Sequence, residues 1–413
     1  MDIKEFLNTS YTAYHAVDNG KKMLAENGFS ELDFGENWSI ERGKGYYFSL
    51  NDSALFAFKV GEGNNFMIAE NHTDSPCLKV KGNELADSHE GKLLNVEKYG
   101  GLILYSMFDI PLKIAGRILS KTENGLTKKL VSSDYFVNIP SLAIHHQPEV
   151  NNVFAPSVQR EMLPLLGAVK DFSYLFVGEN ILDKDLFVVP AVVPFVSGVN
   201  GEFLSSPRID NLTSVYTVLT ALVQCQPEGV ALACCFDNEE IGSGTRQGAS
   251  SSTLETVISK IANGLGLSDE EMAKAKHNGF ILSADNAHAT HQAHPEKSDP
   301  LSKVYLNKGV VIKHHSNYST DGLSSAILKN ILDKANVEYQ NYYNNSDIRC
   351  GGTIGLVSSA LTGMTTVDVG LAQLSMHSAV ETVGLHDIDK MTACVKAVFE
   401  TTLSINGANV TIE

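Results

Sequence analysis

Two adjacent glutamates, Glu239 and Glu240, follow the apolar run 230–236 and precede a glycine-rich loop. Neighbouring side chains on an extended segment point in different directions. One carboxylate can therefore bind a metal ion while the other faces a water molecule. Metal-dependent hydrolysis needs one group that binds the metal ion and another that faces the water, so the pair predicts a hydrolytic metal site.

Four further segments each present a ligand-type residue at a predicted strand end or in a loop. Two histidines and three carboxylates suit two divalent metal ions with one carboxylate bridging them. Zinc accepts such nitrogen and oxygen ligands, and cobalt or manganese accepts them too. Two ions about 3.5–4 Å apart can activate water and polarise a carbonyl oxygen. The candidate ligands are His72, Asp210, Glu240, Asp285 and His377.

Asp74 lies two residues after His72, within reach of the second nitrogen of that imidazole. A carboxylate in this position fixes the tautomer and the ring orientation of a metal-bound histidine. We therefore expect Asp74 to support the site without binding metal itself.

Alternating helical and strand patterns predict the scaffold that positions these residues. Open α/β sheets place their sites at the carboxyl ends of the strands, where several of the candidates fall. The pattern predicts helices over 3–28, 210–223, 250–264, 321–335, 352–361 and 386–405, and strands over 45–50, 54–60, 66–70, 229–236, 279–284, 337–343 and 365–370.

Between these patterns the chain changes character. Short β-like runs at 102–107, 112–119, 129–131 and 186–194 are separated by turn residues, and no long amphipathic helix stands out. We therefore predict a β-rich domain, residues 91–201, inserted into a catalytic α/β domain formed by residues 1–90 and 202–413.

Composition narrows the possible partners and compartment. The 413 residues include 32 basic and 48 acidic ones, a net charge of −16, which argues against nucleic acid or an anionic membrane as the main partner. No run of 18 apolar residues predicts a spanning helix. Six cysteines without CxxC pairing indicate free thiols, and the N-terminus lacks a signal-peptide pattern, so we expect a cytoplasmic protein.

Five motifs together resemble, in order, those of the aspartyl aminopeptidase family, which are dinuclear zinc exopeptidases. The resemblance extends from the first predicted helix to the last. The motifs are HTDSP at 72–76, SPRIDNL at 206–212, DNEEIGS at 237–243, SADNAHA at 283–289 and MHS at 376–378.

The resemblance implies a zinc-exopeptidase α/β/α sandwich and a role for each residue. His72 and Asp285 would bind one metal ion, Glu240 and His377 would bind the other, and Asp210 would bridge them. Glu239 would be the general base, which needs a pKa of about 6–7 to work near neutrality. The family also tends to have a cis peptide bond after the bridging aspartate.

The family also implies a substrate site and an assembly. Its inserted β-rich domain mediates dimerisation, and its histidine at the position of His145 reaches the partner's active site. His288 and Tyr318 match pocket residues. Dimers of the family assemble into dodecamers, which restrict access to short peptides.

The sequence departs from the family in the segment that binds the acidic side chain of the substrate's N-terminal residue. Aligned on Tyr318, the family's lysine is replaced by His315, although Lys313 lies two positions away. A histidine with a pKa near 6.5 is mostly uncharged at neutral pH and therefore binds a substrate carboxylate weakly. Selection of Asp or Glu is therefore open, and a neutral or broader preference is the alternative.

Two other functions stay open at this point. The altered segment around His315 leaves room for a related dinuclear amidohydrolase that acts on N-acyl amino acids. A non-catalytic assembly or scaffold protein is the alternative from another class, although the intact ligands and Glu239 argue against it.

Overall fold

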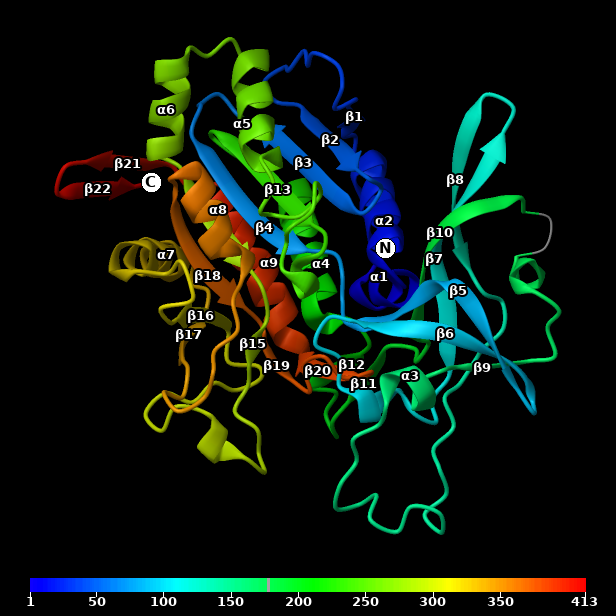
Figure 1. Ribbon diagram of the computed structural model, residues 1–413. Helices are drawn as coiled ribbons and strands as arrows, with labels where there is room; N and C mark the ends of the chain where they lie inside the picture. The colour runs from blue at the N-terminus through cyan, green and yellow to red at the C-terminus, as the bar shows by residue number, and fades with distance from the viewer. Residues whose placement is uncertain (177–178) are drawn as a thin grey trace.

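A nine-stranded sheet forms the centre of the computed structural model, which describes residues 1–176 and 179–413 (Figure 1). Its four central strands, β13, β4, β14 and β18, run parallel, and the neighbours on either side run antiparallel to them. In spatial order the strands are β1 (Ser30–Glu31), β2 (Gly45–Leu50), β3 (Ala54–Val60), β13 (Val230–Phe236), β4 (Phe66–His72), β14 (Phe280–Ala284), β18 (Thr365–Gly370), β16 (Val310–His314) and β17 (Tyr339–Tyr343).

Helices cover both faces of this sheet, each over its own hydrophobic cluster. One face carries α1 (Ile3–Thr9), α2 (Ala13–Glu26), α4 (Ile209–Gln224), α7 (Gly322–Ala335) and α9 (Leu385–Phe399), and the other carries α5 (Thr253–Gly264), α6 (Asp269–His277) and α8 (Ile354–Thr362). The predicted α/β/α sandwich is confirmed.

Strand β13 is apolar throughout because both of its faces are buried. Ala231, Ala233 and Cys235 face the cluster under α4 and α9, while Leu232 and Cys234 face the cluster under α5. A strand buried on both faces needs no polar alternation. The apolar run therefore ends where the strand ends, at Phe236, just before the turn that carries the two glutamates.

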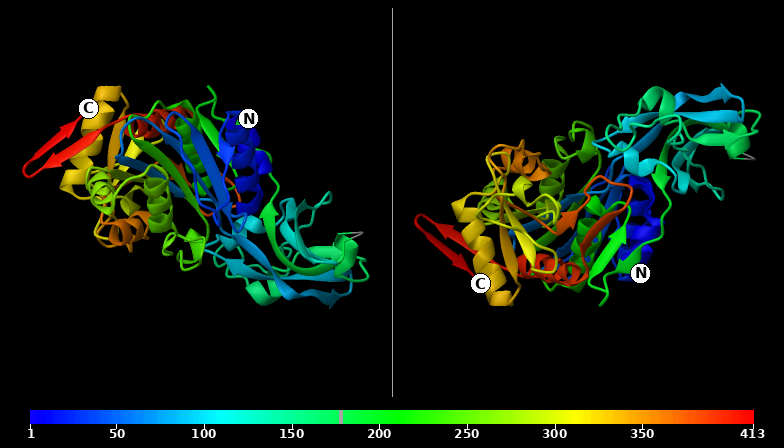
Figure 2. Two further views of the ribbon diagram at one scale, coloured as in Figure 1. Left: turned by 90° about the horizontal axis from the view of Figure 1, so that it is seen from above. Right: turned by 90° about the horizontal axis from the view of Figure 1, so that it is seen from below.

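A second sheet of six strands lies at one end of the first, as the turned views show (Figure 2). It has its own hydrophobic cluster. In spatial order its strands are β8 (Gly125–Ser132), β7 (Leu112–Thr122), β10 (Ile181–Pro190), β5 (Cys77–Ser88), β6 (Gly91–Tyr99) and β9 (Leu165–Gly167). The domain division at residue 91 stays a prediction. Because β5 already pairs with β6, this sheet begins before that residue.

A third sheet of five short strands supports the rim of the first. In spatial order its strands are β11 (Phe195–Ser197), β12 (Phe203–Ser206), β20 (Glu381–Gly384), β19 (Ala372–Leu374) and β15 (Ala287–His288). The loop between β19 and β20 carries His377. This sheet therefore brings a residue from near the C-terminus to the carboxyl ends of the central strands.

Three predicted elements are wrong in part. The helix predicted over 3–28 is two helices, because Ser10 and Thr12 leave helical geometry between α1 and α2. The last helix ends at Phe399, and a hairpin of β21 (Leu403–Asn406) and β22 (Asn409–Ile412) follows, turning at Gly407 with φ 58°. The run 102–107 contains the 3₁₀ turn Leu104–Met107 and no strand. No helix among the described residues is long and apolar enough to cross a membrane.

Candidate active site

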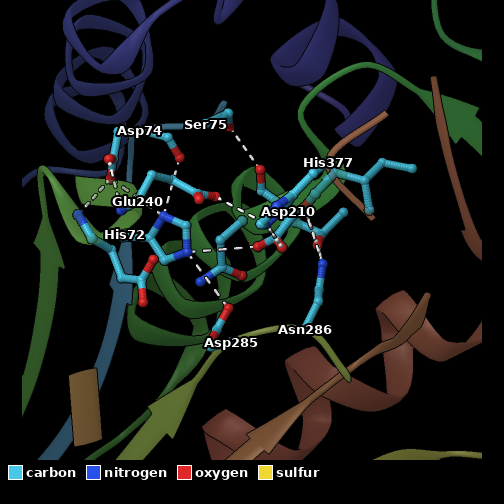
Figure 3. Close-up of polar contacts among 12 residues, drawn as sticks. His72, Asp74, Ser75, Asp210, Glu240, Asp285, Asn286 and His377 are labelled. Carbon is cyan, nitrogen blue, oxygen red and sulfur yellow. Dashed lines mark hydrogen bonds and ion pairs between the residues drawn. The ribbon is translucent and has the colours of Figure 1, made fainter. Parts of the chain in front are cut away.

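The five predicted metal ligands meet at the carboxyl ends of the central strands (Figure 3). His72 is the last residue of β4, and Asp285 follows β14 directly. Glu240 lies in a 3₁₀ turn after β13, Asp210 lies in the first turn of α4, and His377 lies between β19 and β20. The sheet thus gathers residues that are up to 305 positions apart in the chain.

Asp210 lies between two histidines. Its Oδ1 is 3.6 Å from Nε2 of His72, and its Oδ2 is 3.5 Å from Nε2 of His377. Asp285 Oδ1 lies 3.5 Å from the same His72 nitrogen, and Glu240 Oε1 lies 3.4 Å from the same His377 nitrogen. The ligand atoms form two groups that share one carboxylate.

The residues present fit two bound cations. The four separations exceed those of ordinary hydrogen bonds, and the buried Oδ1 of Asp210 has no hydrogen-bond partner among the described residues. Imidazole nitrogens and carboxylate oxygens are the ligands that zinc accepts. We conclude that the donor set and its spacing suit zinc at both groups.

The electrostatics of these buried residues also favour bound cations. Burial and the negative charge of Asp210 raise the pKa of Glu240 well above its usual range. Burial disfavours a charged His72, but the surrounding carboxylates Asp210 and Asp285 outweigh it and raise the pKa of that imidazole. Buried carboxylates this close together repel one another, and a bound cation relieves the repulsion.

Hydrogen bonds orient both imidazoles toward the centre. The Nδ1 of His72 lies 3.0 Å from the main-chain oxygen of Asp74, and the Nδ1 of His377 lies 3.2 Å from that of Gly101. A carbonyl oxygen accepts only, so each Nδ1 carries the proton and each Nε2 keeps its lone pair for a metal ion. Gly101 follows β6, so the second sheet helps to orient a residue of the first.

Asp74 organises the glutamate pair. Its Oδ1 accepts from the main-chain amide of Glu239 at 3.1 Å, and its Oδ2 accepts from that of Glu240 at 3.2 Å. The hydroxyl of Tyr99 donates to the same Oδ2 at 2.7 Å. Asp74 Oδ1 also lies 3.4 Å from Nδ1 of His72. The carboxylate therefore fixes the turn that carries Glu239 and Glu240.

Glu239 has a pKa in the range that suits a general base. Burial raises its pKa to about 7, with a smaller opposing effect from His72. Its carboxylate lies within the same group of donor atoms as His72 and Glu240. A base with a pKa near the working pH accepts and returns a proton efficiently.

A cleft of about 480 Å³ opens above these residues. Two of the predicted substrate-binding residues, His288 and Tyr318, line it. His315 does not line the cleft; its ring packs edge-on against Tyr318, with centroids 5.9 Å apart. His145 lies in an exposed loop of the inserted segment and is not part of this cleft.

Two residues support the site in ways that the sequence motifs do not specify. Glu381 accepts from the main-chain amides of Asp210, at 2.9 Å, and His377, at 2.6 Å. In the sequence, Glu381 follows His377 by four residues and matches the family at that position. Lys313, considered above as a reader of acidic substrates, is instead 2% exposed and donates to the main-chain oxygen of Asp285 at 2.8 Å, with Oδ2 of that residue at 3.3 Å. The peptide bond after Asp210 is cis, as the resemblance implied.

Comparison with known proteins identifies the family. The profile described as Aminopeptidase I zinc metalloprotease (M18) matches residues 6–175 and 173–399. Probable M18 family aminopeptidase 2 of Clostridium acetobutylicum is 39% identical over 407 residues, which cover 93% of this chain and 94% of the relative. Aspartyl aminopeptidase 1 of Schizosaccharomyces pombe is 32% identical over 446 residues, which cover 97% and 94%.

Solved structures agree. A chain in the cryo-EM structure of the Ape4 and Nbr1 complex matches with a TM-score of 0.91 at 31% identity, over 96% of this chain and 84% of that one. The mApe1 structure of Chaetomium thermophilum matches with a TM-score of 0.84 at 27% identity, over 96% of both chains. The predicted resemblance is confirmed, and the chain belongs to the M18 family of zinc metallo-aminopeptidases, hydrolases that act on peptides.

Proposed function

We propose that the chain releases the N-terminal residue of short peptides at a site that holds two zinc ions. The placement of Asp210 carries this proposal, because its two oxygens face His72 and His377 separately. One carboxylate facing two imidazoles is the arrangement of a bridging ligand. Asp285 would complete the ligands of the first ion, and Glu240 would complete those of the second.

Zinc bound there supplies a Lewis acid that activates water and polarises the scissile carbonyl. Glu239 takes the proton from the attacking water and returns it to the amine that leaves. Asp74 keeps Glu239 in place through its main-chain amide, so that the base faces the centre of the site. Burial of Glu239 keeps its pKa near 7 and matches both proton transfers to neutral conditions.

We propose that the cleft prefers peptides with an acidic N-terminal residue, and we would test this preference first. Lys313 is held by Asp285 and is not free to read a substrate carboxylate. Arg349 lines the cleft, is exposed, and has no hydrogen-bond or ion-pair partner among the described residues. Its guanidinium is charged at every relevant pH and can bind a carboxylate through two donors. It is therefore the side chain best suited to replace the family lysine.

We propose a homodimer that assembles into a dodecamer in the cytoplasm. The mApe1 structure of Saccharomyces cerevisiae, which matches with a TM-score of 0.81 at 24% identity, is a dodecamer. The six cysteines are all free and buried, as is usual in a reducing compartment. In such an assembly, His145 would reach the cleft of the partner subunit.

Initial rates on chromogenic Asp, Glu, Leu, Ala and Lys substrates, with zinc, cobalt or manganese added, test the proposal. We expect cleavage that Glu239→Gln abolishes, together with two bound metal ions per chain. A preference for Leu or Ala would assign a neutral specificity. Cleavage of N-acyl amino acids without release of any N-terminal residue would contradict the proposal.

A further inference from the structure

Asp368 is a fully buried carboxylate in the second half of β18. No basic side chain of the described residues lies within ion-pair distance of it. Its charge is instead satisfied by hydrogen bonds: Oδ2 accepts from the amide of Ser319 at 2.7 Å and from its hydroxyl at 2.5 Å, and Oδ1 accepts from the hydroxyl of Thr353 at 2.6 Å. Burying a charge is costly unless it is bonded in this way.

These donors belong to two separate loops of the cleft wall. Ser319 follows Tyr318 in the loop 315–320, and Thr353 ends the loop 344–353, which carries Arg349 and Cys350. Tyr318, Arg349 and Cys350 all line the cleft. Asp368 therefore joins two wall segments that come from different parts of the chain.

The two loops also contact each other directly. The thiol of Cys350 lies 3.2 Å from the hydroxyl of Tyr318, and the side-chain amide of Asn317 donates to the main-chain oxygen of Cys350 at 3.2 Å. The main-chain amide of Asp368 donates to the hydroxyl of Thr320 at 2.9 Å. The two loops are therefore joined both directly and through Asp368.

Helix α8 fixes the carboxylate from the other side. A Cβ atom added to Gly355 would lie 2.6 Å from Oδ1 of Asp368, so the first turn of α8 packs directly on the carboxylate. A negative charge is favourable at this end of a helix. Thr353 precedes α8 and makes no side-chain capping bond; its hydroxyl donates to Asp368. Figure 1 shows α8 beside β18.

We propose that Asp368 is a positioning residue for the substrate. Through Ser319 and Thr353 it fixes the wall of the cleft that holds the peptide, and so sets the affinity for the peptide. It touches none of the metal ligands by a hydrogen bond, so zinc binding and the chemical step do not depend on it. The inference rests on the proposed function only in that the cleft binds peptides.

The test removes the two hydroxyl bonds and leaves Asp368 in place. Ser319→Ala combined with Thr353→Val preserves volume closely and deletes both hydroxyl donors. We expect KM for the cleaved peptide to rise about five- to tenfold, with kcat changed less than about twofold and zinc content unchanged. Restoring a hydroxyl with Thr353→Ser in the same Ser319→Ala background should recover part of the loss.

Thr366→Val is the matched control. Its hydroxyl is also buried on β18 and donates to the main-chain oxygen of Met364 at 3.0 Å, away from both loops. We expect it to lower the melting temperature as the double variant does, but to leave KM unchanged. An unchanged KM in the double variant, or a loss of zinc or of kcat, would overturn the inference.

Hydrogen–deuterium exchange supplies a readout that needs no turnover. In the zinc-loaded double variant, amides in 315–320 and 344–353 should exchange faster than in the parent and in Thr366→Val, while those around Glu239 should not change. Unaltered exchange in the two loops refutes the positioning role even if the proposed peptidase activity is itself absent. Faster exchange in a protein that cleaves no peptide would refute the proposed function alone.

Discussion

Glu381 accepts a hydrogen bond from the main-chain amide of Asp210 at 2.9 Å, although 171 residues separate the two in sequence. Its other oxygen accepts from the amide of His377 at 2.6 Å. One buried carboxylate thus sets the backbone of both the shared carboxylate and a histidine of the second group. This pair of hydrogen bonds therefore fixes the backbone at Asp210 relative to the backbone at His377.

Replacing Glu381 by Gln should weaken zinc binding. A glutamine keeps one acceptor and turns an amino group toward one of the two main-chain amides, which also donates. We expect zinc affinity and activity to fall about 10- to 100-fold, the usual cost of losing a partner of a metal ligand. Bound zinc measured by mass spectrometry after dialysis checks this. Glu338→Gln, at an exposed ion pair with Lys390, is the control and should bind zinc normally.

Replacing Glu239 by Gln should remove catalysis and spare the metal site. The amide cannot accept a proton from water, so kcat should fall by at least about 10²–10⁴-fold. Zinc content and the melting temperature of the zinc-loaded protein should stay close to those of the parent, because Glu240 remains. A variant with more than about a tenth of the parental kcat would show that another group serves as the base.

Stability should depend on pH through Glu70, which is fully buried in β4. Burial raises its pKa from 4.5 to about 8, despite an opposing effect of Ser358. A raised folded pKa means that the contribution of Glu70 is complete below the unfolded pKa and is lost as the pH rises toward the folded one. Glu70→Gln does not titrate, so its stability relative to the parent should grow by roughly 3 kcal/mol between about pH 5 and about pH 8.

Urea unfolding of both zinc-loaded proteins across this range measures the difference. A gap between Glu70→Gln and the parent that does not change with pH would mean that Glu70 is already ionised in the folded protein. The exposed substitution Glu338→Gln should show no such trend.

Arg349 should decide the acidic preference. Arg349→Gln removes the charge and keeps much of the length, so KM for Asp and Glu substrates should rise about tenfold while KM for Leu changes little. Lys297→Gln, a second cation that lines the cleft, is the comparison. An equal rise in KM for Asp and Leu substrates would show that Arg349 shapes the cleft but does not bind the substrate carboxylate.

The sequence predicts the site well where local context carries it. His72, Asp285 and Glu240 come at the ends of apolar runs, so strand periodicity alone brings them to one edge of the sheet. Glu381 and Lys313 could not be found in this way. Their partners are main-chain atoms or side chains brought close by β16, β18 and β20, and no local pattern records that contact.

The errors in the fold have a similar origin. Apolar residues continue with helical spacing from α9 into Leu403 and Ile405, so periodicity extends the helix through a strand. The hairpin forms because Gly407 and Ala408 make the turn between the paired residues Asn406 and Asn409. Alignment on Tyr318 predicts His315 in the pocket, but its ring packs edge-on against Tyr318 and does not line the cleft. Side-chain direction in a loop is set by contacts that a motif does not specify.

A substitution at His145 tests whether two subunits contribute residues to one active site. Its loop is exposed and lies outside the cleft of its own chain, so we expect an effect on catalysis to act in a neighbouring subunit. His145→Gln should lower kcat about 10²-fold through loss of a donor to the substrate carbonyl. The adjacent His146→Gln, with the same change of charge and the same exposure, should be close to the parent.

Mixing subunits makes the prediction decisive. His145→Gln and Glu239→Gln chains, each nearly inactive alone, are refolded together. A mixed dimer contains one cleft with an intact Glu239 from the first chain and an intact His145 from the second, so activity should return to about a quarter of the parental value, since half of the dimers are mixed and half of their sites are complete. If the mixture stays as inactive as its components, His145 acts within its own subunit or not at all.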